Sequence, residues 1–167
     1  MSTSLIPASK HVNIKSMVVP GITLLALSTI AGPAPSTRKA SADISKPKRT
    51  GLAIEEIRSI LQEDFETRNS FASGDLSEDI YDDNCVFTDP IQVTNGLKTY
   101  IKGVQALFNP KLSKCRLLEP MTVTENGRIF ARWEAEFVTN LPFSPKFKPY
   151  TGTTTYTVDK RGLVIDR

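Results

Sequence analysis

Apolar and charged positions alternate through residues 117–138, on both sides of Asn126-Gly127. This dipeptide suits a two-residue hairpin turn, in which both positions need positive φ. Such a turn predicts three cross-strand pairs, Glu125–Arg128, Val123–Phe130 and Met121–Arg132. The period of two then gathers the uncharged residues on one face, namely Leu118, Thr122, Thr124, Ile129, Ala131, Trp133, Ala135 and Phe137. We therefore expect a long curved hairpin with that face buried.

Helical spacing precedes this hairpin, and strand patterns follow it. Apolar residues from Ile54 to Phe65 recur every three to four positions, which predicts a helix over residues 52–72 that Gly74 ends. Weaker patterns predict a short helix over 76–81 with Asp75 as its N-cap, a strand over 85–88, a loop over 91–96 and a helix over 97–108. A proline-rich loop over 140–149 leads to strands over 150–158 and 163–167.

Helices that come first and antiparallel strands that come later indicate an α+β domain. We expect a curved antiparallel sheet wrapped around the long N-terminal helix, as a cone with a pocket at its open end. The strand over 163–167 is short, so we expect it to be incomplete. This domain spans residues 51–167 and follows a segment of residues 1–50 with a different composition.

Residues 1–42 contain four basic residues and no acidic one, and they are rich in serine and threonine. This composition is typical of a transit peptide, and we expect import into the plastid stroma. The alternatives are a secretory signal, with residues 17–31 as its apolar core, and a mitochondrial one. That apolar run is too short to span a membrane comfortably.

The remaining residues hold 17 basic and 18 acidic side chains (21 − 4 against 18), a net charge of −1. A nucleic-acid partner is therefore not expected, because such binding needs many Lys and Arg contacts. The one histidine, His11, lies in the expected targeting segment, and Cys85 and Cys115 have no metal-binding spacing. We expect no metal and no cofactor, and acid–base chemistry would need Asp, Glu, Tyr, Lys or Cys.

Residues 71–90, FASGDLSEDIYDDNCVFTDP, resemble the opening of nuclear-transport-factor-2-like (NTF2-like) domains, which include ketosteroid-isomerase-like and SnoaL-like enzymes. The shared positions are Gly74-Asp75-Leu76, Asp82-Asp83, Asp89-Pro90 and Gly96, and residues 158–164 resemble the last turn of that fold. The resemblance covers residues 52–167, and residues 130–154 look most like an uncharacterised plastid and cyanobacterial branch. It implies the cone-shaped fold, but the superfamily includes both enzymes and non-enzymatic binding domains.

Asp89 resembles the aspartate of the Asp-Pro pair in ketosteroid isomerases, which is the general base of those enzymes. A tyrosine and a protonated aspartate form their oxyanion hole. Here Thr67 stands at the tyrosine position, and no acidic residue stands near Thr151. Of the three catalytic groups, the base has a counterpart in Asp89, whereas the tyrosine and the protonated aspartate of the oxyanion hole have none. The alternative for Asp89 is a turn-forming side chain that caps backbone N–H groups before the next helix.

Arg132 and Glu134 resemble the Arg-x-Asp of epoxide hydrolases in the same superfamily, with Glu in place of Asp. The predicted register puts them on the charged face, where Glu134 faces Glu119, and indicates a surface charge ladder or a dimer face. A register shift of one residue would instead turn them toward the pocket.

The residues expected to line the pocket are Trp133, Tyr100, Tyr156 and Thr67. The unfilled catalytic positions favour a non-catalytic binding or scaffold domain for an apolar small molecule or a protein partner, with a homodimer formed through the sheet. The alternative is a small cofactor-free isomerase or hydrolase that uses Asp89 as its base.

Overall fold

A computed structural model describes residues 47–167, so the expected targeting segment lies, up to residue 46, outside the described residues. The helical elements are α1 (Ile54–Arg68), α2 (Ser70–Ser73), the 3₁₀ turn η1 (Glu78–Ile80) and α3 (Leu97–Leu107). The strands are β1 (Tyr81–Thr88), β2 (Val93–Asn95), β3 (Lys114–Leu117), β4 (Thr122–Val123), β5 (Ile129–Glu136), β6 (Tyr150–Val158) and β7 (Val164–Asp166). In this part of the chain, no helix has the length and apolar character needed to cross a membrane.

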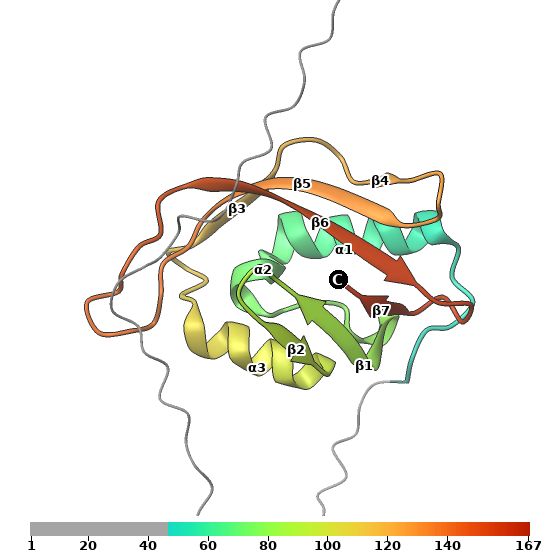
Figure 1. Cartoon of the computed structure of the whole chain (residues 1–167), viewed down its shortest axis with the longest axis horizontal. Helices are drawn as coiled ribbons and strands as arrows, with labels where there is room; N and C mark the ends of the chain where they lie inside the picture. The colour runs from blue at the N-terminus through green and yellow to red at the C-terminus, as the bar shows by residue number, and fades with distance from the viewer. Residues whose placement is uncertain (1–46) are drawn as a thin grey trace, which may run out of the picture. The chain divides into compact units, whose positions relative to one another are not determined.

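The strands form one curved sheet in the order β2-β1-β7-β6-β5-β3, and β4 pairs with β5. The pair β1–β7 is parallel and the other pairs are antiparallel. In Figure 1, α1 lies under the arch of β3, β5 and β6, and α3 packs beside β1 and β2. This is the expected α+β architecture of a long helix inside a curved sheet.

The short last strand lies inside the sheet, between β1 and β6, rather than at its edge. Its ladder continues past Asp166, because Arg167 N–H donates to Val86 O at 3.0 Å and Thr88 N–H donates to Arg167 O at 2.8 Å. These bonds fix the backbone of Arg167 against β1.

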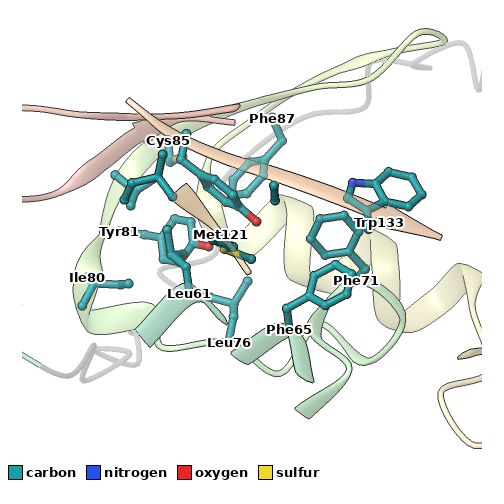
Figure 2. Packing of buried hydrophobic residues seen from close by; sticks show 14 of the residues in the cluster. Leu61, Phe65, Phe71, Leu76, Ile80, Tyr81, Cys85, Phe87, Met121 and Trp133 are labelled. Carbon is teal, nitrogen blue, oxygen red and sulfur yellow. The ribbon is translucent and has the colours of Figure 1, made fainter. Parts of the chain in front are cut away.

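The core lies between α1 and the inner face of the sheet. Ile57, Leu61 and Phe65 recur on one side of α1 and are at most 2% exposed. They pack with Phe71 and Trp133 in a single hydrophobic cluster, part of which Figure 2 shows. The helical periodicity of the sequence predicted this face.

The predicted single helix over residues 52–72 is broken at Asn69, which adopts the left-handed conformation with φ 51°. The chain then makes the short helix α2, and Gly74, with φ 66°, ends it as predicted. Asparagine visits this conformation more readily than most residues, so it can turn the chain without a glycine. After the break, Phe71 of α2 packs against both Phe65 and Trp133.

The predicted register of the hairpin is wrong by one residue at the turn. The loop has three residues, since Thr124 N–H donates to Arg128 O at 2.8 Å and Gly127 alone among them has a positive φ, 69°. This is the three-residue hairpin with a left-handed glycine, and it needs no positive φ at Asn126. Thr122 therefore pairs with Phe130.

The register shifts again beyond Pro120, where Leu117 pairs with Trp133. In β5 the alternation places the predicted uncharged face inward. In the segment that pairs with β5, the predicted inner and outer faces are exchanged. Met121, predicted on the charged face, is 2% exposed, whereas Leu118, predicted on the buried face, is 37% exposed. The extra loop residue causes this reversal, because one residue of slip exchanges the two faces of a strand.

Candidate binding site

Arg167 provides a cationic group among aromatic rings inside the cone. Its Cζ lies 3.8 Å from the ring centroid of Phe71, and its Nη1 donates to the hydroxyl oxygen of Tyr100 at 2.7 Å. Phe71 comes from α2, Tyr100 from α3, and Arg167 follows β7 directly. The two helices and the central strand therefore meet at one guanidinium.

Further rings surround this group. The Cζ of Arg167 is 5.0 Å from the ring of Tyr100, 5.7 Å from that of Tyr156 and 5.8 Å from that of Phe87. Phe87 and Tyr100 stack with centroids 3.9 Å apart and ring planes 5° apart. Aromatic faces attract cations, most strongly where water is excluded, so the rings partly replace the hydration that burial removes.

The charge of Arg167 has no acidic partner among residues 47–167: no carboxylate lies within ion-pair distance of it. Burial by itself lowers the pKa of Arg167, but the neighbouring tyrosine hydroxyls, chiefly that of Tyr100, outweigh burial and raise it. Burial raises the pKa of Tyr156 to about 12, so this phenol stays neutral. The site therefore combines one permanent cation with the neutral phenol of Tyr156.

Trp133 extends the aromatic surface from Phe71 toward solvent. Its ring meets Phe71 edge-on at 5.4 Å and Tyr150 edge-on at 5.7 Å. The indole Nε1 donates to Thr154 Oγ1 at 3.0 Å, and the ring lies over Gly152, which has no side chain to obstruct it. Tyr150, at the outer end, is 40% exposed.

Residues 55–167 match the sequence model of DUF2358, a family described as an uncharacterised conserved protein. The chain belongs to this family. Its fold, a curved sheet around a long helix, resembles that of a solved cystatin-fold protein. The search of curated proteins found no match to this chain.

Solved structures resemble this DUF2358 chain in fold at low sequence identity. An epoxide hydrolase/cyclase-like enzyme with a role in pyran ring formation in salinomycin has a TM-score of 0.50 and 16% identity, and the match covers 67% of this chain and 88% of that one. A cystatin-fold protein from Novosphingobium aromaticivorans has a TM-score of 0.50 and 10% identity, over 70% of this chain and 96% of that one. An NTF2-like protein from Salmonella enterica has a TM-score of 0.48 and 13% identity, over 68% and 89%. At these identities the similarity concerns the fold alone.

Asp89, the candidate general base, lies in an exposed turn after β1. Its Oδ1 accepts the backbone N–H of Ile91 at 2.7 Å and that of Gln92 at 2.9 Å, and its own N–H donates to Gln92 O at 3.0 Å. This is the turn-forming geometry weighed against catalysis in the sequence analysis.

Asp64 is a buried carboxylate that the sequence analysis did not single out. It is 1% exposed and accepts bonds from Ser77 N at 2.7 Å and Ser77 Oγ at 2.9 Å, and Arg68 Nη1 lies at 3.2 Å. Burial raises its pKa, while the Ser77 bonds and Arg68 act in the opposite direction. Because both oxygens are bonded, this carboxylate joins α1 to the segment before η1 rather than facing a ligand.

Of the residues expected to line the pocket, Trp133, Tyr100 and Tyr156 surround the Phe71–Arg167 pair. Thr67 does not: it is exposed and lines a surface hollow of about 310 Å³ with Arg58, Ser59, Gln62, Glu63 and Glu66. These are polar positions of α1 that avoid the core-facing side. A weak helical pattern near the end of α1 could not settle which way Thr67 points.

Arg132 and Glu134 belong to the outer side of β5, and Glu119 is exposed in the bend between β3 and β4. Arg132 is exposed and pairs across the strands with Thr153, and Glu134 forms an ion pair of 2.6 Å with Arg116. The predicted opposition of Glu119 and Glu134 is wrong, because the shifted register sets Arg116 opposite Glu134. A second hollow, of about 290 Å³, lies beside this pair.

Arg167 and Phe87 were not recognised from the sequence. Arginine is usually exposed, so nothing in a local pattern marks one that enters a core. Phe87 lay within the predicted strand over 85–88, but its contact with Tyr100 depends on how β1 packs on α3.

Proposed function

We propose that this DUF2358 domain is a non-catalytic binding domain whose cone interior holds an apolar small molecule. The observation that carries the proposal is the composition of the interior around Arg167: aromatic rings and neutral phenols, with a cation that carries out no proton transfer at neutral pH. The exposed position of Asp89 and the bonded state of Asp64 support it, because neither carboxylate is available there as a base.

The first test is native mass spectrometry of the protein isolated from the cells that make it. The expected result is a small molecule that leaves when the chain unfolds. The variant Phe71→Leu should reduce its retention, because Phe71 lies between Trp133 and Arg167. Phe143→Leu is the matched control, since Phe143 is 103% exposed and outside the core. A chain that retains no small molecule, or two variants with equal retention, would contradict the proposal.

Asp89→Asn separates this function from the enzymatic alternative. Asparagine keeps the Oδ1 that accepts the Ile91 and Gln92 N–H groups, so the turn should survive. Ligand retention and thermal stability should equal those of the wild type. Accumulation of an unconverted substrate in the variant, with its product in the wild type, would instead favour catalysis.

We also propose that the protein acts in the plastid stroma, on the composition of residues 1–42. A fluorescent protein carrying residues 1–50 at its N-terminus should enter plastids. Its appearance in the secretory pathway or in mitochondria would select one of the alternatives.

A further inference from the structure

We propose that the ligand of this domain carries a carboxylate, which pairs with Arg167, on an apolar body that lies along Phe71 and Trp133. This inference rests on the proposed binding function and adds the chemical class of the ligand. Arg167 would bind the carboxylate, and the rings of Phe71 and Trp133 would contact the apolar part of the ligand.

The guanidinium of Arg167 has unused donors. A guanidinium has five N–H groups, and the described residues provide one hydrogen bond to it, with Tyr100. Within residues 47–167, the fully buried side-chain polar atoms without a partner are Asn69 Oδ1 and Thr139 Oγ1. The remaining nitrogens of Arg167 are not in that set, so they stay open to water or to a ligand.

The charge of Arg167 is not paired by an acidic side chain of the described residues. Arg167 is half-buried, and withdrawing part of a cation from water has a cost that cation–π contacts offset only in part and that a paired anion can offset further. None of the carboxylates in the described residues lies within ion-pair distance of Arg167. A ligand anion would therefore gain the attraction that this fold leaves unused.

The shapes of the Arg167 and Tyr100 side chains suit a carboxylate. The planar fork of arginine matches a carboxylate, with two parallel N–H donors. The Tyr100 hydroxyl accepts its bond from Arg167 and so retains its own proton for donation. A carboxylate beside both groups would receive donors from the guanidinium and from the phenol.

From the ring under the guanidinium, the aromatic contacts run from Phe71 to Trp133 at 5.4 Å and on to Tyr150 at 5.7 Å. Phe71 and Trp133 are 7% and 9% exposed and Tyr150 is 40% exposed, so this row of rings reaches the surface at Tyr150. A flat or linear apolar body with a carboxylate at one end matches that arrangement.

The test compares matched ligands on the full-length protein by isothermal titration calorimetry at neutral pH. The probes are 2-naphthoate with 2-naphthamide and decanoate with decanamide, so each pair differs in the charged group alone. In at least one pair we expect the carboxylate to bind about tenfold tighter or more, the scale of one charge-assisted hydrogen bond. Equal binding within both pairs would overturn the carboxylate inference and leave the binding function standing.

Two variants locate the effect. Arg167→Met should reduce carboxylate binding to the level of the amide and leave amide binding unchanged, whereas Arg128→Met, at an exposed arginine beside the hairpin turn, should change neither. Tyr100→Phe removes one hydroxyl and should weaken carboxylate binding several-fold, so the inference stays testable if Arg167→Met does not fold. A carboxylate preference that survives the Tyr100 and Arg167 substitutions would overturn this site, and failure of all four probes to bind would overturn both the inference and the proposed function.

Discussion

Replacing Gly152 with alanine should disturb the packing of Trp133 directly. The two residues are cross-strand partners in β6 and β5. A Cβ on Gly152 would lie 2.5 Å from Cζ2 and 2.6 Å from Cη2 of the indole. Carbon atoms in contact normally lie about 3.5–4.0 Å apart. The ring must therefore move by roughly an ångström, or the strands must separate.

The expected cost follows from what holds the ring. Overpacking of a core costs about 1–3 kcal/mol. Displacement also strains the Trp133–Thr154 hydrogen bond of 3.0 Å, and loss of such a bond costs about 0.5–1.5 kcal/mol. The sum is about 1.5–4.5 kcal/mol of unfolding free energy, a large part of the roughly 5–15 kcal/mol of an ordinary domain.

Urea denaturation followed by tryptophan fluorescence measures both consequences, because Trp133 is the one tryptophan in the sequence. The midpoint should fall, and the emission of the folded protein should shift as the ring changes its surroundings. Gly103→Ala is the matched control: no atom lies within 4 Å of an added Cβ there, and alanine in a helix is favoured by about 0.5–1 kcal/mol. A Gly152→Ala protein with wild-type midpoint and emission would refute this account of the packing.

Three further outcomes are expected. Burial raises the pKa of the Asp64 carboxyl above 3.8 in the folded protein, so as pH rises the unfolded chain loses the carboxyl proton before the folded protein does. The unfolding free energy of the wild type, compared with that of Asp64→Asn, should therefore fall as pH rises from 3.8 through the folded-state pKa. Burial raises the pKa of both Cys85 and Cys115 to about 12, so at pH 8 iodoacetamide should label them about a thousandfold slower than an unperturbed thiol, and unfolding should remove the difference. Arg132→Glu should dissociate a homodimer formed through the outer sheet face and leave ligand binding intact, whereas Arg128→Glu should do neither; sedimentation velocity distinguishes them, and a dimer unaffected by Arg132→Glu would place its interface elsewhere.

The elements with strong periodicity could be predicted from sequence. The core face of α1 follows from the spacing of Ile57, Leu61 and Phe65. The strand over residues 150–158 has the predicted bounds, because proline precedes it and a glycine turn follows it. In both cases the local preference and the tertiary environment agree.

The register of the hairpin could not be predicted, because Asn126-Gly127 is compatible with two turn geometries. A two-residue loop and a three-residue loop differ by one position, and that difference decides whether Met121 or Leu118 is buried. In β5 the alternation between Ile129 and Phe137 is strong enough to fix its inner face under either register. The segment that pairs with β5 has apolar residues on both faces and is interrupted by Pro120, so its pattern does not distinguish the two registers.

Trp133, Tyr100 and Tyr156 were expected in the pocket, but their meeting with Phe71 and Arg167 could not be predicted, for a different reason. Phe71, Tyr100 and Arg167 come from three separate segments, and they meet only because β7 enters the sheet between β1 and β6. From its sequence alone, a strand as short as β7 is expected at the edge of a sheet. Its parallel pairing with β1 makes β7 a central strand and fixes the backbone of Arg167 over the core. Sequence rules place an arginine at such a position in solvent. Violations of such local rules concentrate at functional sites, so a half-buried cation with unused donors is where a ligand should be sought first.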